Sequence, residues 1–208
     1  MITIIDYGAG NLRSVLNAFA KLGYTTKVVS TPQEVYKAEA LILPGVGAAG
    51  HIMQSLKALA LDNAIREYIN QNRHFLGICV GMQVLLSKTG ENGGYNCLNI
   101  IPGNVKRFNE GLKVPHIGWN QVKQKQNHPI FNGIADETNF YFVHSYYCDP
   151  QDKTVIAGET AYGKTFCSAI IKGNMIATQF HPEKSGETGL RIYDNFIKLA
   201  TGKNNSVE

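Results

Sequence analysis

Strand signals alternate with helix signals through residues 2–87, and this alternation restricts the chain to a small set of folds. Short runs of β-branched and other apolar residues indicate strands at 2–5, 25–29, 40–43 and 74–78. Between these strands, apolar residues recur at helical spacing, as they do from Leu12 to Phe19. Strands joined through helices form right-handed crossovers, and such crossovers produce a parallel sheet.

Local signals set the boundaries of several helices. The segment Thr31-Pro32-Gln33-Glu34 combines a capping box with a proline at the first helical position, which predicts a helix start there. Residues 51–72 are expected to be helical in two pieces, with Asp62 as an internal cap. A further helix is expected from Met82 to Ser87.

The character of the sequence changes after Asn96. Runs rich in Val, Ile, Tyr and Phe, separated by turn residues, predict antiparallel strands at 98–101, 121–125, 140–144, 154–158, 166–171 and 175–180. A last helix carries Leu190 and Tyr193 on one face and ends at Gly202. We therefore predict an α/β fold, an open and mostly parallel sheet flanked by helices, with an antiparallel second half. Residues 1–202 are expected to form one domain and 203–208 a polar tail.

The composition argues against two classes of partner. Hydrophobic residues make up 44% of the chain and charged residues 17%, as in a soluble globular protein. The net charge of +4 comes from scattered Lys and Arg, without the basic run or aromatic interleaving typical of nucleic-acid binding. No apolar stretch is long enough to span a bilayer, and the N-terminus does not resemble a signal peptide. We expect a cytoplasmic protein that binds neither nucleic acid nor membrane.

The four cysteines, Cys79, Cys97, Cys148 and Cys167, are widely spaced. They include no Cys-x-x-Cys pair and no histidine partner at zinc-finger spacing, so neither a disulfide framework nor a zinc site is expected. Free cysteines are mostly small buried apolar residues, and this reading suits all of them except Cys79.

Cys79 lies in the segment Gly77-Ile78-Cys79-Val80-Gly81, between a predicted strand and a predicted helix. The pattern Gly-x-Cys-x-Gly is the cysteine form of the nucleophile elbow, a sharp turn that lifts the nucleophile out of the sheet. Glycines are needed because neighbouring backbone passes close to such a turn. Free N–H groups at a helix N-terminus favour the thiolate, which is the reactive form of cysteine. The alternative is a buried cysteine that happens to lie between two glycines.

His181-Pro182-Glu183 follows the predicted strand 175–180 and contains the base that a nucleophilic cysteine needs, with an acceptor to orient it. In an open parallel sheet, ligands bind beyond the carboxyl ends of the strands. Pro44-Gly45-Val46-Gly47 follows another strand at that edge, where its N–H groups and that of Val80 could hold an oxyanion. Taken alone, the histidine would more often be structural and the glycine turn an ordinary tight turn.

The glycines after the first strand do not form a nucleotide-binding fingerprint. Arg13 stands where the third glycine of that motif would be, and no acidic residue closes the second strand near Ser30. The sequence also contains no Gly-x-x-x-x-Gly-Lys phosphate loop and no metal-binding cluster. We expect hydrolytic or transfer chemistry without a cofactor or a metal.

Two motifs taken together resemble those of the class I, or triad, glutamine amidotransferases. Residues 77–83 contain the cysteine elbow, and residues 179–185 contain the His-Pro-Glu segment. Three further stretches are similar to the glutaminase subunits of imidazole glycerol phosphate synthase, a branch of this family: 6–12, 115–120 and 141–146. The resemblance extends from Met1 to about Gly202 and implies a flavodoxin-like sheet.

The resemblance implies roles for the residues at matching positions. Cys79 would attack the side-chain amide carbon of glutamine, His181 would protonate the departing ammonia, and Glu183 would orient His181. The oxyanion would be held by N–H groups of Val80, Val46 and Gly47. The amino-acid end of glutamine would contact Gln83, His144, Ser145 and Tyr146.

The same resemblance implies a partner. A cyclase subunit would form a heterodimer with the chain and would use the ammonia to make imidazole glycerol phosphate and an aminoimidazole carboxamide ribonucleotide, a step of histidine biosynthesis. The residues expected to face this partner are Asn11, Trp119, Tyr141 and Lys184.

Departures from the family pattern leave alternatives open. Ala48-Ala49 stands where a bulkier residue is expected, and residues 87–90 lack the acidic pair often found there. A related subunit that passes ammonia to a different synthase would fit these departures. A cysteine peptidase or γ-glutamyl hydrolase could use the same triad, although Gln83 together with 144–146 argues against it. A non-catalytic binding partner is disfavoured because all three triad residues are present.

Overall fold

The computed structural model describes residues 1–8, 11–108 and 111–202. The predicted tail, 203–208, lies outside the described residues. The strands are β1 (Ile2–Ile5), β2 (Thr26–Val29), β3 (Ala40–Gly45), β4 (His74–Cys79), β5 (Leu86–Thr89), β6 (Tyr95–Asn96), β7 (Ile101–Arg107), β8 (His116–Gln124), β9 (Thr138–His144), β10 (Tyr146–Pro150), β11 (Ile156–Ala161), β12 (Thr165–Lys172) and β13 (Met175–Thr178). The α-helices are α1 (Leu12–Lys21), α2 (Pro32–Lys37), α3 (Ala49–Ala58), α4 (Leu61–Asn70), α5 (Val80–Gln83) and α6 (Gly186–Thr201). Single 3₁₀ turns are η1 (Glu91–Gly93), η2 (Pro129–Phe131), η3 (Lys153–Val155) and η4 (Pro182–Lys184).

The strands form a mixed sheet whose parallel half carries the candidate nucleophile. β2, β1, β3, β4 and β13 lie side by side in that order, and each pair is parallel. From β13 the sheet continues through β12, β10 and β7 with antiparallel pairing, and then through β5 and β6. The sheet confirms the predicted fold class, with a parallel first half and a mainly antiparallel second half.

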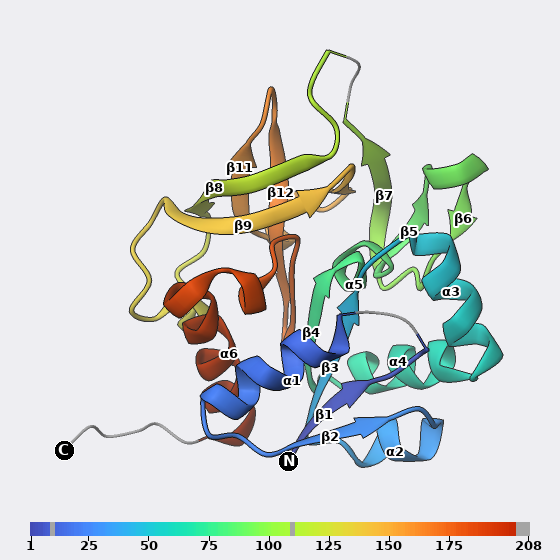
Figure 1. The fold of residues 1–208 in the computed structure, drawn as a ribbon. Coiled ribbons are helices and arrows are strands. Elements are labelled where there is room, and N and C mark those ends of the chain that lie inside the picture. The colour runs from blue at the N-terminus through green and yellow to red at the C-terminus, as the bar shows by residue number, and fades with distance from the viewer. Residues whose placement is uncertain (9–10, 109–110, 203–208) are drawn as a thin grey trace.

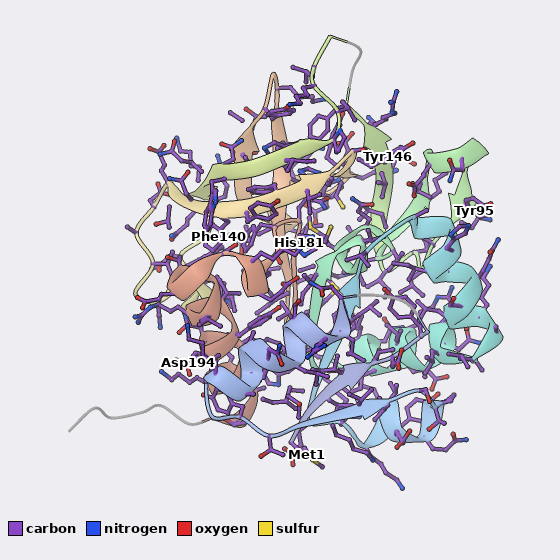
Figure 2. The ribbon with its side chains drawn as sticks, viewed as in Figure 1. Met1, Tyr95, Phe140, Tyr146, His181 and Asp194 are labelled. Carbon is purple, nitrogen blue, oxygen red and sulfur yellow. The ribbon has the colours of Figure 1, made fainter. Side chains whose placement is uncertain are left out.

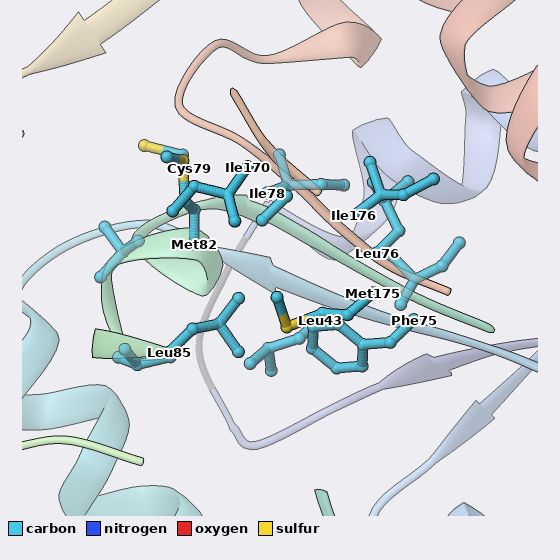
Figure 3. Packing of buried hydrophobic residues seen from close by; sticks show 14 of the residues in the cluster. Leu43, Phe75, Leu76, Ile78, Cys79, Met82, Leu85, Ile170, Met175 and Ile176 are labelled. Atoms are coloured by element: carbon cyan, nitrogen blue, oxygen red, sulfur yellow. The ribbon is translucent and has the colours of Figure 1, made fainter. Parts of the chain in front are cut away.

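Helices cover both faces of the parallel strands (Figure 1). α1 and α6 lie on one side, and α3 and α4 lie on the other, with α2 packed against α4. Because both faces are covered, β3 is buried at every position, as expected for a central parallel strand. Leu43, Phe75 and Met175 pack together on one face of the sheet beneath the elbow, and Leu76 and Ile176 lie on the other face (Figure 3). None of the helices in the described ranges is long and apolar enough to cross a membrane.

A two-stranded ribbon, β8 and β9, lies across the end of the parallel strands (Figure 1). The register of this ribbon runs from His116 opposite His144 to Val122 opposite Thr138. β9 contacts η4, the turn that follows β13, and β8 pairs on its other edge with β11. The ribbon is therefore held at this end of the sheet by its contacts with η4 and β11.

Two predictions about helices are wrong. The helix expected from Met82 to Ser87 stops at Gln83, and β5 follows it and pairs with β7. Apolar runs this short fit a helix or a buried strand equally well, so pairing with a distant strand decides between them. Asp62 does not cap α4, because the helix starts at Leu61 after a left-handed Ala60. Asp62 pairs instead with Arg66 one turn later, at 3.3 Å.

The strand expected at 98–101 is also misplaced, since β7 begins only at Ile101. The N–H groups of the preceding residues, Leu98 and Ile100, bond to the carbonyl groups of Val84 and Leu85, just after α5. These bonds hold the segment as a loop against the elbow. Its apolar side chains are buried for that reason and not because they belong to a strand.

Candidate active site

Cys79 lies at the junction of β4 and α5 in a backbone conformation that side chains rarely adopt. Its φ is 54° and its ψ is −108°, in the left-handed half of conformational space. Such a residue costs about 1–3 kcal/mol and persists only where its surroundings fix it. A Cβ atom on Gly81 would collide with the carbonyl oxygen of Leu43, and one on Gly45 would collide with the backbone of Gly81. The glycines therefore let β3 pass directly under the elbow that presents Cys79 (Figure 3).

His181 and Glu183 form a buried pair just beyond β13. The Nδ1 atom of His181 lies 2.8 Å from Oε1 of Glu183, and the two side chains are 2% and 1% exposed. The hydroxyl group of Tyr193, from α6, donates to the second carboxylate oxygen, Oε2, at 3.1 Å. Both oxygens of Glu183 are thus held, which fixes the plane of the carboxylate and the ring that it faces.

The environment of this pair favours the charged imidazolium. Burial lowers the pKa of His181, but the nearby Cys79 and Glu183 outweigh burial and raise that pKa above its usual range. Burial raises the pKa of Glu183, and the opposing influence of His181 wins, so that pKa lies below its usual value. The Nε2 atom of His181 is buried and has no hydrogen-bond partner among the described residues. This free ring nitrogen is available for proton exchange with the thiol or with a substrate.

A cavity of about 370 Å³ opens beside these residues. Figure 2 shows His181 in the middle of the molecule, between the β8–β9 ribbon and the parallel strands. The cavity is lined by Val46, Gly47, Cys79, Val80, Gln83, Glu91, Pro115, Val143, His144, Ser145, Tyr146, His181 and Lys184. All the residues predicted to bind glutamine or the oxyanion therefore line one cavity together with Cys79 and His181. Glu183 lies behind His181 and does not appear in this lining.

The turn predicted to hold the oxyanion, residues 44–47, is attached through a tyrosine to the segment that follows β1. The hydroxyl group of Tyr7, which is 2% exposed, donates to the carbonyl oxygen of Pro44 at 2.9 Å. Gly47, at the end of the turn, has a φ of 87°, which glycine adopts without strain. The turn is therefore fixed at Pro44 by Tyr7 and closed at Gly47 by a left-handed glycine.

Glu91 is a lining residue that sequence reasoning missed. Its Oε2 atom accepts a hydrogen bond at 2.7 Å from the N–H of Ala49, at the start of α3. This bond holds a carboxylate at the cavity wall, where it could accept an ammonium group. Glu91 lies on η1 in the segment Gly90-Glu91-Asn92-Gly93, which matches no motif. Its position at the cavity is therefore visible only in the folded structure.

A chain of hydrogen bonds runs from the ribbon to the wall of the cavity. The carbonyl oxygen of Tyr146 accepts from Nε2 of Gln83 at 2.9 Å, and it lies 2.8 Å from Nδ1 of His144. The Nε2 atom of His144 lies 3.0 Å from Nδ1 of His116 on β8. Both ring nitrogens of His144 are thereby engaged within the protein. His144 lines the cavity, but its ring nitrogens are occupied by His116 and by the backbone carbonyl of Tyr146, whose position they help to fix.

Three of the four residues predicted to face a partner lie together on the surface. Trp119 on β8 is 58% exposed, and its ring centroid lies 6.1 Å from that of Tyr141 on β9. The Nζ atom of Lys184 lies 5.8 Å from the ring centroid of Tyr141. Asn11 lies at the start of α1, where its Oδ1 accepts from Ser14 at 2.7 Å. Ile117, also 58% exposed, adds an apolar side chain that sequence reasoning missed.

The other three cysteines are also buried. Burial raises the pKa of Cys97, Cys148 and Cys167, which keeps their thiols protonated and unreactive. Across the described ranges, no three His, Cys, Asp or Glu side chains are grouped as metal ligands would be.

Comparison with known proteins establishes the family. The family model described as glutamine amidotransferase class-I matches residues 3–199. The chain belongs to the class I glutamine amidotransferase family. Among solved structures, PurLQS from Thermotoga maritima aligns with this amidotransferase at a TM-score of 0.76 and 16% identity, covering 95% of this chain and 97% of the other. A crystal structure of a glutamine amidotransferase gives 0.74 and 19%, with coverage of 96% and 99%. These two likenesses concern the fold.

Curated relatives of this amidotransferase carry a more specific name. One from Dehalococcoides mccartyi, imidazole glycerol phosphate synthase subunit HisH, is 54% identical over 202 residues, covering 97% of this chain and 98% of the relative. A relative of the same name from Herpetosiphon aurantiacus is 46% identical over 207 residues, covering 100% of this chain and 98% of the relative.

Proposed function

We propose that this amidotransferase hydrolyses glutamine to glutamate and ammonia through a thioester on Cys79. The observation that carries the proposal is the cavity in which the strained Cys79 lies beside the buried His181–Glu183 pair. The thiol gives its proton to His181, and the thiolate attacks the amide carbon of glutamine. The resulting tetrahedral oxyanion accepts hydrogen bonds from the N–H groups of Val80 and the Val46-Gly47 turn.

Collapse of the tetrahedral intermediate completes the first half of the reaction. The carbon–nitrogen bond breaks, and His181 returns its proton to the departing nitrogen, so that ammonia leaves and a glutamyl thioester remains. His181 then takes a proton from water as the water attacks the thioester, and glutamate and the thiol are released. Glu183 stabilises the imidazolium in both halves.

The walls of the cavity suit the amino-acid end of glutamine. The carboxylate of Glu91 would accept the α-ammonium group, and Gln83, Ser145 and Tyr146 would contact the remaining polar atoms. His144 would act through Tyr146, because its ring nitrogens are engaged with His116 and the Tyr146 carbonyl. No cofactor or metal is required for any step.

The acceptor of the ammonia is proposed from the relatives. Their name, imidazole glycerol phosphate synthase subunit, supports a heterodimer with a cyclase that makes imidazole glycerol phosphate and an aminoimidazole carboxamide ribonucleotide in the cytoplasm. The exposed patch of Ile117, Trp119, Tyr141 and Lys184 would face that cyclase, with Asn11 at its border. Ammonia would pass directly from the cavity to the partner.

The test is glutamate release from glutamine by the purified chain, alone and with the histidine-pathway cyclase and its nucleotide ligand. We expect strong stimulation by the cyclase and loss of at least about a thousandfold in Cys79→Ala, because the nucleophile is removed. Cysteine-dependent hydrolysis that ignores the cyclase would retain the glutaminase and redirect the search to another synthase. Hydrolysis that survives in Cys79→Ala would refute the mechanism.

A further inference from the structure

Gln179 is a buried polar residue next to the nucleophile that the mechanism above does not use. It lies between β13 and His181 and is 0% exposed. Its backbone N–H donates to the carbonyl oxygen of Ser168 at 2.9 Å, which fixes the start of the side chain. The Nε2 atom of Gln179 lies 3.6 Å from Sγ of Cys79, within hydrogen-bonding range for the large sulfur atom.

The orientation of this amide follows from its partners. The carbonyl oxygen of Tyr146 can only accept, so Gln83 must point Nε2 toward it. The same Nε2 lies 3.1 Å from the side chain of Gln179, which must therefore present its oxygen to Gln83. With Oε1 committed to Gln83, only the N–H group of Gln179 can face the sulfur. The backbone carbonyl of Tyr146 therefore determines, through Gln83, that Gln179 donates to the sulfur of Cys79.

The elbow itself gives the sulfur little help in carrying negative charge. α5 is a single turn of four residues, Val80–Gln83, so its dipole is much smaller than that of a long helix. Among the hydrogen bonds of the described residues, the one from Gln179 is the one that reaches Sγ. We propose that Gln179 is a fourth catalytic residue, which donates an N–H group to the Cys79 thiolate and couples its position to Gln83.

This inference rests on the proposed role of Cys79 as nucleophile. Its consequence is a thiolate that forms at lower pH than it would without the amide, because a hydrogen bond to the charged form favours that form. The titratable groups that interact with the sulfur are His181 beyond β13, Tyr7 after β1 and Cys148 on β10. Glu91, His144 and Lys184 line the same cavity. All of these groups remain in a Gln179 variant, so a changed pH dependence of alkylation reports the loss of the amide.

The experiment measures carbamoylmethylation of Cys79 by iodoacetamide as a function of pH in the full-length chain. Mass spectrometry assigns the modified cysteine. Gln179→Met has a similar volume but no donor, and Gln179→Asn keeps an amide that is one methylene too short to reach Sγ. In both variants we expect the midpoint of alkylation to move up by about one pH unit and the rate at neutral pH to fall about tenfold.

A matched control is Gln124→Met. Gln124 also donates through Nε2, to the carbonyl groups of Ile134 and Ala135, but it lies at the far end of β8. Its alkylation profile should equal that of the unmodified chain. With the cyclase present, Gln179→Met should lower kcat for glutamine hydrolysis while KM stays within about twofold, because the lost interaction is made with the nucleophile.

An unchanged alkylation midpoint in both Gln179 variants would overturn the inference. A raised KM with unchanged kcat would show that Gln179 acts only by placing Gln83, which would also overturn it. Alkylation measures the reactivity of the Cys79 thiol and does not require glutamine hydrolysis. The inference can therefore survive if glutamine is not the substrate, and it can fail while the glutaminase proposal stands.

Discussion

At the scale of single residues, the carboxylate proposed to orient His181 is held by a tyrosine from a distant helix. Glu183 accepts from Tyr193 on one oxygen and faces His181 with the other. Tyr193→Phe removes this hydrogen bond but retains the ring, which packs against Phe19 with centroids 4.5 Å apart. A hydrogen bond to a charged group contributes about 1.5–3 kcal/mol. We expect kcat for glutamine hydrolysis to fall about tenfold with little change in KM, measured in the complex with the cyclase.

Tyr24→Phe is the matched control for that variant. Tyr24 donates to Asp194, the next residue of α6, at 2.7 Å, so the control also removes a phenol–carboxylate bond at the same helix. Asp194 lies outside the cavity, and we expect kcat to be unaffected. Equal kcat values in Tyr193→Phe and the unmodified chain would show that Glu183 holds its orientation without the phenol.

The sequence could predict the residues that carry local patterns and not those that act through the fold. Cys79 and His181 lie in motifs whose glycine and proline residues indicate a tight turn at each position. Tyr193 follows helical spacing and is indistinguishable from any apolar core residue until α6 is placed beside η4. Glu91 reaches the site through contacts between segments distant in sequence. Gln179 lies in the 179–185 motif, but its contacts with Cys79 and Gln83 are visible only in the folded chain.

At the scale of elements, the β8–β9 ribbon contains two buried histidines that bond to one another. The carbonyl oxygen of Tyr146 can only accept, so Nδ1 of His144 donates to it and Nε2 of His144 accepts from Nδ1 of His116. Nε2 of His116 lies 3.3 Å from Nδ2 of Asn120, which can only donate, so both rings are neutral. Burial, above all, lowers the pKa of His144 to about 3. In the unfolded chain a histidine protonates near pH 6.5. Between these values the unfolded state binds the additional proton, and the free energy of unfolding therefore decreases as pH falls.

This linkage can be measured by urea unfolding at pH 7, 6 and 5, above the range in which most carboxylates titrate. We expect stability to decrease toward pH 5, with His144 contributing up to about 1.4 kcal/mol per pH unit. Burial also lowers the pKa of His116, which adds to the slope. A His144→Gln variant should show a shallower decrease. An NMR titration in which the His144 ring protonates between pH 6 and 7 would contradict the argument.

Helices and strands whose ends are marked by capping residues, proline or glycine could be predicted from the sequence. α2 begins at Pro32, as its capping segment indicates, and α1 ends just before Gly23, which has a φ of 78°. β5 could not be predicted, because Leu86–Thr89 becomes a strand only by pairing with β7 and β6. The parallel first half of the sheet could be predicted because buried parallel strands consist of continuous apolar runs.

At the scale of the whole molecule, the cavity and the exposed patch share the ribbon and η4. Lys184 lines the cavity and also lies over the ring of Tyr141 in the patch. β9 carries both Tyr141 and His144, one at the surface and one at the cavity wall. A protein bound to the patch would therefore contact the same strand that positions Tyr146. This arrangement supports the proposal that the cyclase stimulates the glutaminase.

Trp119→Ala tests whether the patch binds the cyclase. Buried aromatic residues at interfaces often contribute about 2 kcal/mol, which corresponds to about thirtyfold in Kd. We expect Kd for the cyclase, measured by calorimetry, to rise by about that factor, while the stability of the isolated chain hardly changes because the ring is 58% exposed. Leu59→Ala, which truncates an exposed apolar side chain between α3 and α4, should leave Kd unchanged. At saturating cyclase, stimulated hydrolysis by Trp119→Ala should recover, since the substitution weakens docking and leaves the triad intact. An unchanged Kd for Trp119→Ala would place the cyclase on another face of the molecule.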